Sequence, residues 1–142
     1  MMPVIPNTQR SFKKALDELR LVGLRPTRQR LALAKLLFEG GNRHVTAENL
    51  HAEARACKVR VSLATVYNSL HQFTAVGLLR EIFVDPQRLY FDTNIAVHHH
   101  FFHEGSGSLE DIPGDQVVVS LIPSPPDGTV VKSVEVIVRV GS

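Results

Sequence analysis

The hydrophobic repeat of this chain changes near residue 77, and this change is its strongest constraint on the fold. Before that point apolar residues recur with the 3.6-residue period of helices, and after it they alternate with the two-residue period of strands. Helices followed by strands predict an α+β fold. At 142 residues the chain has room for one ordinary domain or two small ones, which excludes a large multi-domain enzyme.

Four amphipathic helices are predicted in the first half. The first covers Ser11–Leu21 and stops at Gly23, which leaves residues 1–10 as a flexible arm. The second opens at Arg25-Pro26-Thr27 and runs to about Phe38, the third is capped by Thr46, and the fourth runs from a Ser62 cap to about Val76. The expected buried faces are Phe12, Ala15, Leu16 and Leu19; Leu33, Leu36 and Leu37; Ala47, Leu50 and Ala54; and Leu63, Val66, Leu70 and Phe73.

A hairpin is predicted directly after the helices. Residues 79–84 and 89–93 read as strands on either side of the turn residues Asp85-Pro86-Gln87. Helices followed by a small hairpin are the layout of a winged helix-turn-helix. We therefore expect residues 1–93 to form a winged-helix DNA-binding domain.

The remaining residues, 94–142, predict a small α/β module. Short strands are expected at 98–103 and 109–112, a short helix or strand at 115–121, and a loop at 123–128. The clearest late strand is Val130–Val140, because valines alternate along it. A unit of this size is marginal alone. We expect it to pair with a second copy through residues from about 96 to 140, as the dimerisation and ligand-sensing domain of a homodimer.

Charge divides the chain in the same way. Residues 1–84 hold 13 Lys or Arg against 6 Asp or Glu, whereas residues 85–142 hold 3 against 8. A basic first part joined to an acidic second part favours a polyanion partner for the first part.

The outward face of the fourth helix has the character of a recognition helix. Thr65, Asn68 and Gln72 lie on this face, which is small and polar near its start at Ser62, and Tyr67 and His71 lie at its flanks. Such a face fits a major groove and offers hydrogen bonds to base edges. Upstream, Arg25, Arg28 and Arg30 are candidates for phosphate or minor-groove contacts.

Histidine and carboxylate are the candidate metal ligands. The single cysteine, Cys57, cannot form an internal disulfide or a cysteine-rich zinc site. On a strand, His98 and His100 face one way, and His99 and His103 face the other. The sequence has neither a signal peptide nor a membrane-length apolar run, so no membrane association and a cytoplasmic location are expected.

At these motifs the sequence resembles the ferric uptake regulator superfamily. The matching segments, in order, are residues 23–30 (GLRPTRQR), 44–48 (HVTAE), 62–67 (SLATVY), 90–92 (YFD) and 98–100 (HHH). Residues 24–30 (LRPTRQR), residues 90–94 (YFDTN), the triple His with Phe101-Phe102, and residues 111–113 (DIP) resemble its iron-response regulator branch. That branch is known for haem-responsive control of iron and haem-synthesis genes.

The resemblance implies roles for individual residues. Tyr67 would touch a thymine, Arg25 would approach the minor groove, and Asn68 stands where many relatives carry a phosphate-binding Arg. His44, on the predicted loop before the third helix, resembles part of the regulatory metal site together with Asp92 and His100, and this site would bind Fe(II), Mn(II) or Zn(II). A further histidine of relatives is Phe102 here, so His98 or His103 would have to take its place.

The resemblance also implies haem binding at His98, His99 and His100, with the neighbouring phenylalanines against the porphyrin. The predicted function is a haem-responsive or metal-responsive transcriptional regulator, with the character of a repressor, that binds a pseudo-palindromic operator in double-stranded DNA. The alternative is an ordinary divalent-metal sensor without haem. Two more distant alternatives are a metal-dependent hydrolase built on His44 and Asp92, and a metal or haem carrier that does not bind DNA.

Overall fold

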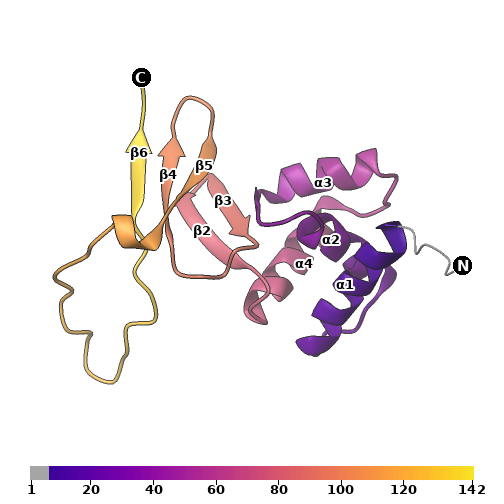
Figure 1. Cartoon of the computed structure of the whole chain (residues 1–142), viewed down its shortest axis with the longest axis horizontal. Coiled ribbons are helices and arrows are strands. Elements are labelled where there is room, and N and C mark those ends of the chain that lie inside the picture. Colours follow the sequence, from indigo (N-terminus) through magenta and orange to yellow (C-terminus); the bar gives the residue numbers. More distant parts are fainter. Residues whose placement is uncertain (1–6) are drawn as a thin grey trace, which may run out of the picture. The chain divides into compact units, whose positions relative to one another are not determined.

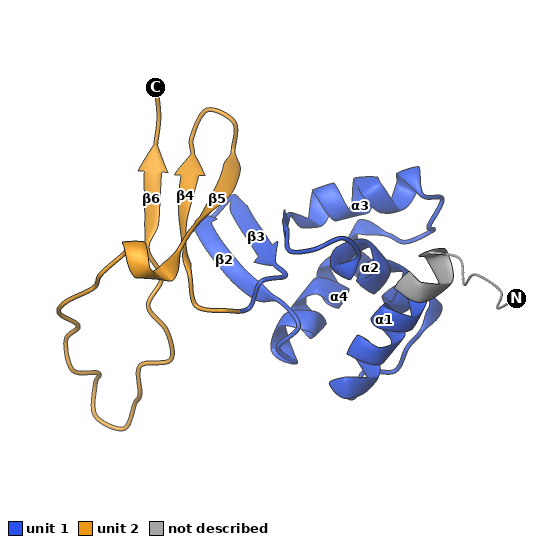
Figure 2. Cartoon of the chain, in the orientation of Figure 1, with its two compact units in different colours: residues 1–95 blue, residues 96–142 orange. Residues whose placement is uncertain are grey.

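The computed structural model describes residues 7–142, with side chains from Phe12 onward. It divides into two compact units, one of residues up to Ile95 and one of residues 96–142 (Figure 2). Helices come first and small sheets follow (Figure 1), so the predicted α+β class is confirmed. Within the described residues, none of the helices combines the length and apolar character needed to cross a membrane.

The first unit is a set of helices with a three-stranded antiparallel sheet. The sheet has the order β1-β3-β2, so β3 is its central strand. The helix α1 packs on α2, and α3 packs on α4. The elements are α1 (Asn7–Leu21), α2 (Arg28–Phe38), β1 (His44–Val45), α3 (Ala47–Ala56), α4 (Leu63–Ala75), β2 (Arg80–Asp85) and β3 (Arg88–Asp92).

Each of the helices α2, α3 and α4 begins at a hydroxyl cap. Thr27 accepts a hydrogen bond from the backbone N–H of Arg30 (3.2 Å), and Thr46 and Ser62 each make the same bond to the third residue of their helix (both 3.1 Å). A side-chain oxygen here satisfies a backbone donor that the helix itself leaves open. The predicted caps Thr46 and Ser62 are therefore confirmed.

The core of the first unit consists of the inward faces of all four helices and of β3. Most of the predicted stripe is buried, and Val66, Leu70 and Phe73 of α4 are fully so. Leu63 was expected in that stripe but is 36% exposed, because it lies in the first turn of α4, at the edge of the core.

Two further expectations for the first unit were wrong. His44 was expected in a loop but lies on β1, which pairs with the end of β3. Two residues carry too little periodicity to predict a strand, and only the pairing defines it. Residues 7–10 were expected in a flexible arm but form the start of α1, whereas residues 1–6 of that predicted arm lie outside the described part of the chain.

The second unit contains a three-stranded sheet of order β5-β4-β6. A long irregular segment of the chain connects β5 to β6 (Figure 1). The hairpin of β4 (His99–His103) and β5 (Ser108–Ile112) is antiparallel, and β6 (Ile137–Val140) runs parallel to β4. A short 3-10 helix, Gly114–Gln116, follows β5. The hairpin strands lie where the sequence predicts them.

The largest difference from the sequence prediction lies in the valine-rich segment near the end of the chain. Of the expected Val130–Val140 strand only Ile137–Val140 is paired, and the expected helix or strand at 115–121 is limited to the 3-10 turn. Alternating valines give a strand preference, but a strand forms only where a neighbour supplies hydrogen bonds. In this segment the pairing with β4 covers Ile137–Val140, and one further backbone bond joins His100 to the carbonyl oxygen of Val136, whereas Val130 stays 77% exposed.

The buried stripe of α4 leads to a test of the core. Leu70→Ala should lower the free energy of unfolding by about 2–5 kcal/mol, because it removes a fully buried side chain and leaves a cavity. Leu21→Ala is the matched control, since this leucine is 82% exposed and should change the free energy by less than about 0.5 kcal/mol. Chemical denaturation measures both. Equal effects would contradict the packing described here.

Candidate DNA interface and metal ligands

The recognition face predicted on α4 is ordered by a hydrogen bond to α3. The hydroxyl of Tyr67 donates to Oε1 of Glu48 at 2.5 Å. The Tyr67 ring also stacks on the His71 ring, with 6.4 Å between centroids, and His71 meets the edge of Phe91. The ring of Tyr67 is therefore held in one orientation before any DNA arrives. Glu48 was missed by sequence reasoning, because its contact joins two helices.

The hydrogen bond changes the chemistry of the phenol. Glu48 accepts the phenolic proton, which raises the pKa of Tyr67, with smaller contributions from burial and from the negative charge of Glu48. Burial is the main cause of the raised pKa of Tyr90. Tyr67 thus presents a neutral ring and hydroxyl at the surface. A hollow of about 270 Å³ beside it is lined by residues of α3, α4 and the β2–β3 turn: Thr46, Glu48, Tyr67, Pro86, Gln87, Arg88, Leu89 and Tyr90.

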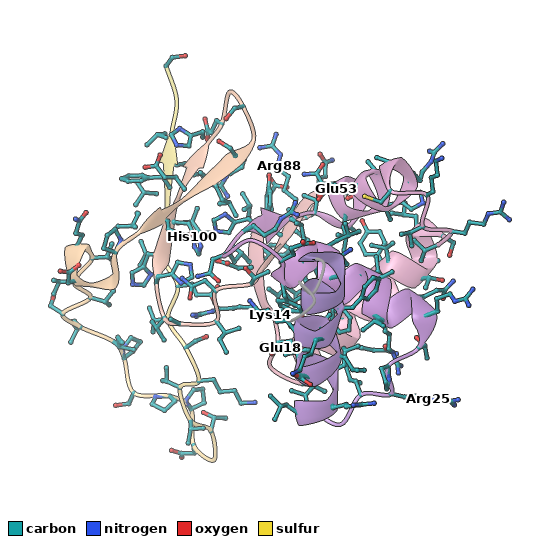
Figure 3. All side chains as sticks on the ribbon, turned by 45° about the vertical axis from the view of Figure 1, so that its right-hand side comes forward. Lys14, Glu18, Arg25, Glu53, Arg88 and His100 are labelled. Atoms are coloured by element: carbon teal, nitrogen blue, oxygen red, sulfur yellow. The ribbon has the colours of Figure 1, made fainter. Side chains whose placement is uncertain are left out.

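The arginines predicted to contact DNA differ in whether their side chains are hydrogen-bonded within the fold. Arg25 and Arg28 are exposed, and Figure 3 shows Arg25 extending outward from its loop. Arg30 instead donates to Oε1 of Gln72 (3.0 and 3.2 Å) and to the carbonyl oxygen of Arg25. This guanidinium links α2 to α4, so a contact of Arg30 with phosphate stays a prediction.

Ser62, Thr65 and Asn68 lie at the start of α4. Ser62 accepts from the backbone of Thr65 and donates to its hydroxyl at 2.9 Å, so both side chains take part in the cap. Asn68 is exposed. The contacts of these three residues with DNA stay predictions.

In the first unit, His44 and Asp92 form one pair of metal-ligating side chains. They are register partners across β1 and β3, and Nε2 of His44 lies 3.1 Å from Oδ2 of Asp92. The other carboxylate oxygen accepts the backbone N–H of Asn94 at 2.8 Å. Asp92 is 1% exposed, so its charge has to be compensated by such partners.

In the second unit, three donors converge on one point of the β4–β5 hairpin. Oδ1 of Asp111 lies 3.2 Å from Nε2 of His98 and 3.3 Å from Nε2 of His100, whose rings are 4.5 Å apart. Asp111 stands directly opposite His100 in the strand register. Two imidazoles and one carboxylate are a donor set for Fe(II), Mn(II) or Zn(II). Figure 3 labels His100 on its strand.

The remaining histidines of β4 are placed differently. His99 accepts the backbone N–H of Val136 through Nδ1 at 3.0 Å, and Nε2 of His103 lies 3.5 Å from Oε1 of Glu110. The alternation expected for this strand therefore holds, since His98 and His100 share a carboxylate that His99 and His103 do not contact. Asp111 was not predicted as a ligand, although the hairpin turn before it could have placed it.

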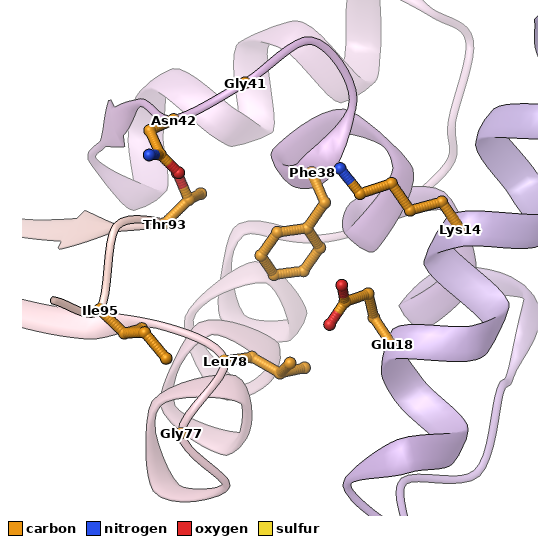
Figure 4. A pocket seen from close by; sticks show the side chains of 9 residues that line it. All are labelled: Lys14, Glu18, Phe38, Gly41, Asn42, Gly77, Leu78, Thr93 and Ile95. Atoms are coloured by element: carbon orange, nitrogen blue, oxygen red, sulfur yellow. The ribbon is translucent and has the colours of Figure 1, made fainter.

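A separate cavity of about 250 Å³ in the first unit holds none of the predicted site residues. Figure 4 shows Phe38 and Leu78 at its centre, with Lys14 and Glu18 of α1 reaching toward it. Its rim on the other side includes Asn42, whose side chain lies 3.5 Å from the hydroxyl of Thr93. The full lining is Lys14, Glu18, Phe38, Gly41, Asn42, Gly77, Leu78, Thr93 and Ile95.

Comparison with known proteins decides the family. The model of the ferric uptake regulator family matches residues 21–121. The chain belongs to this family. It is therefore a DNA-binding, metal-responsive transcriptional regulator and not an enzyme, which excludes the hydrolase alternative.

Individual members of the family have low sequence identity to this chain. The peroxide-responsive repressor PerR of Staphylococcus aureus (strain Mu50 / ATCC 700699) is 27% identical over 113 residues, which are 80% of this chain and 76% of the relative. The ferric uptake regulator of Pseudomonas aeruginosa with manganese has a TM-score of 0.69 at 24% identity and covers 90% of this chain and 97% of its own. That of Francisella tularensis with iron has a TM-score of 0.68 at 18% identity, covering 84% and 92%. The two structures show a shared fold.

Glu48 yields a test of the ordered Tyr67. Glu48→Gln should lower the pKa of the Tyr67 phenol, because the variant loses the carboxylate that holds the proton. Ultraviolet titration in a Tyr90→Phe background isolates this group, since the chain has 2 tyrosines. Glu53→Gln is the control, because Glu53 pairs with Arg43 instead. An unchanged phenol pKa in Glu48→Gln would rule the contact out.

Proposed function

We propose that this regulator senses a divalent metal ion. The His98–His100–Asp111 set of the second unit holds Fe(II), Mn(II) or Zn(II), and the His44–Asp92 pair of the first unit is a second candidate ligand set. The observation that carries the proposal is the convergence of the His98, His100 and Asp111 ligand atoms on one point. His103 lies beside Glu110 and is left out of the set.

The same arrangement explains how metal would control DNA binding. The first unit carries Tyr67 and the basic residues, and a short stretch of chain after β3 joins it to the second unit. An ion bound to the His98–His100–Asp111 set would order the second unit, through which two copies are expected to pair. The two first units of such a dimer would then match the two halves of a pseudo-palindromic operator. Such a regulator acts in the cytoplasm, where DNA is present.

Binding of Co(II) as a spectroscopic probe tests the ligands in the full-length apo protein. His100→Ala and Asp111→Asn should each weaken binding by more than about tenfold, the loss that even outer-shell changes at metal sites cause. His51→Ala and His103→Ala are the matched controls and should bind as the wild type does. Asp92→Asn tests the second candidate set, because unchanged affinity in this variant would show that His44 and Asp92 do not hold the ion.

The metal should also change DNA affinity. If the ion raises affinity for operator DNA, the DNA must raise affinity for the ion by the same factor, so the coupling is measurable from either side. Fluorescence anisotropy of labelled operator, with and without metal, measures it. A coupling factor of one would show that this site does not regulate DNA binding.

Haem is the second candidate ligand. A response to haem would also favour membership of the iron-response regulator branch. Its support is the sequence resemblance at His98, His99 and His100. The carboxylate of Asp111 beside two of these imidazoles supports a divalent cation better than a porphyrin. Haem titration of the same apo protein separates the two. A histidine-type spectrum that survives in Cys57→Ser and is lost when all three histidines become alanine would favour haem.

A homodimer is supported by apolar surface on the second unit. Within the described residues this unit leaves many large apolar side chains exposed, above all those of Val118 (84%), Leu121 (86%) and Val130 (77%). Exposed apolar side chains in such number on a unit this small are typical of an interface with another protein. We expect a second copy to cover them, because the operator of such a regulator has two halves.

Sedimentation of the full-length protein tests the dimer. Leu121→Asp should shift the equilibrium toward monomer, because it places a charge at an exposed apolar side chain that the second copy would cover. Leu21→Asp introduces the same charge at an equally exposed leucine of the first unit and should leave the dimer intact. If both variants sediment as dimers, the interface lies elsewhere.

A further inference from the structure

Three helices of the first unit end in the same hydrogen-bond arrangement. In each, the residue after the cap has a positive φ, and the next residue donates a backbone N–H to the carbonyl five residues earlier. These bonds are Leu24 to Leu19 (2.9 Å), Val59 to Ala54 (2.8 Å) and Leu78 to Phe73 (2.9 Å). This is the Schellman motif, in which the positive-φ position favours glycine because glycine has no Cβ.

Two of the three motifs carry the expected glycine, and the third carries a lysine. Gly23 (φ 77°) ends α1 and Gly77 (φ 84°) ends α4, but Lys58 (φ 59°) ends α3. Lys58 is the one non-glycine residue with positive φ among the described residues. A lysine here costs about 1 kcal/mol or more of backbone strain. Glycine occupies the same position in the other two motifs without this strain. We therefore infer that the side chain of Lys58 has a function that offsets the strain.

The surroundings of Lys58 are strongly basic. It lines two hollows, one of about 330 Å³ and one of about 500 Å³. The first is shared between the start of α2 and the α3–α4 turn, and it is lined by Arg28, Gln29, Ala32, Lys58, Val59 and Arg60. The second is lined by His51, Arg55, Lys58, Val59, Arg60 and Val61. No carboxylate lines either hollow within the described part of the chain.

The cations of this turn also differ from others of the first unit in their partners. Arg43 is paired with Glu53, and Arg88 lies 3.8 Å from a carboxylate oxygen of Asp85. The cations around Lys58 are exposed, and none forms an ion pair with a described carboxylate; they are Arg28, Arg55, Lys58 and Arg60. Like charges gathered without counter-charges are unfavourable, which points to an anion supplied from outside.

The turn is fixed beside the starts of two helices. The side chain of Gln29 donates to the carbonyl oxygen of Arg60 at 3.4 Å, which joins the turn to the first turn of α2. Nε2 of His51 lies 3.1 Å from the carbonyl oxygen of Val61, just before the cap of α4. The cations therefore lie next to the starts of α2 and of α4, on which Arg28 and the recognition residues are carried.

We propose that Lys58 and Arg60, together with Arg28, hold a backbone phosphate of the DNA beside the recognition helix. The proposal rests on the DNA binding of the proposed function and adds a contact that fixes the position of α4 without reading sequence. A turn with glycine in place of Lys58 would have the same backbone but no cation at the centre of the cluster.

Lys58→Gly tests the contact while keeping the turn. The variant should unfold at a Tm equal to or above that of the wild type, because glycine relieves the strain. Its affinity should fall by about 8-fold per protomer at 0.1 M salt, and the slope of log K against log salt should fall by about 0.9 per protomer. The loss should be equal for operator and random-sequence DNA, since a phosphate contact carries no sequence information.

Two variants control for charge. Lys132→Gly makes the same chemical change at an exposed residue of the second unit and should leave affinity and salt slope nearly unchanged. Lys58→Arg keeps the charge and should retain both. Equal losses in Lys58→Gly and Lys132→Gly would overturn the proposal, because net charge alone would then explain the effect. A loss confined to operator DNA would overturn it too, since Lys58 would then contact a base.

The outcomes for the wild type and the variant separate the two proposals. A wild-type protein without salt-dependent DNA binding would remove the proposed function itself. A wild type that binds normally, with a Lys58→Gly variant that binds equally well, would overturn only the phosphate contact. Anisotropy titrations at several salt concentrations give both results.

Cys57 offers a measurement on the unmodified sequence. It is the only cysteine, it is exposed, and it precedes Lys58 directly. If the turn lies against the DNA backbone, operator DNA should slow the alkylation of Cys57 by a bulky maleimide at least several-fold. An unchanged alkylation rate under saturating DNA would place the turn away from the DNA and overturn the proposal.

Discussion

The pairing of β1 with β3 is the interaction on which the first unit depends. The strand β1 has only two residues, yet it ties the connection between α2 and α3 to the central strand of the sheet. One backbone bond, from the N–H of Thr93 to the carbonyl oxygen of Arg43 (3.0 Å), extends the pairing by one residue, and the hydroxyl of Thr93 accepts the N–H of Arg43 at 2.8 Å. The same register sets His44 opposite Asp92. One short ladder thus positions the hairpin and builds a ligand pair.

Charged side chains in this unit fall into two groups with different physical roles. Arg43 donates twice to the carboxylate of Glu53, at 2.6 and 2.8 Å, and also to the carbonyl oxygen of Leu36. The hydrogen bonds to Glu53 and its negative charge raise the pKa of the Arg43 guanidinium against the lowering effect of burial. It therefore serves the fold. Arg25, Arg28 and the cations of the α3–α4 turn are exposed and have no such carboxylate. A regulator of this family needs the second group for a polyanion and the first to keep its helices in place.

The candidate metal ligands show how little chain a site requires. In each unit, two strands in register bring an imidazole and a carboxylate within hydrogen-bond distance, His44 with Asp92 and His100 with Asp111. Antiparallel register fixes such pairs without a dedicated loop. Because these side chains stand on paired strands, their positions follow from the backbone ladder.

The sequence by itself determined the helices, their caps and the polar face of α4, because these depend on residues close together in the chain. Thr46 and Ser62 cap their helices as predicted, and alternation alone separates His98 and His100 from His99. Tertiary structure decided what depends on distant partners. It brought Glu48 to Tyr67 and Asp111 to His100, and it left residues 130–136 outside any strand although their valines favour one. Local preference fixes a helix because its hydrogen bonds lie within four residues, whereas a strand, an ion pair or a ligand set exists only where the fold supplies the other half.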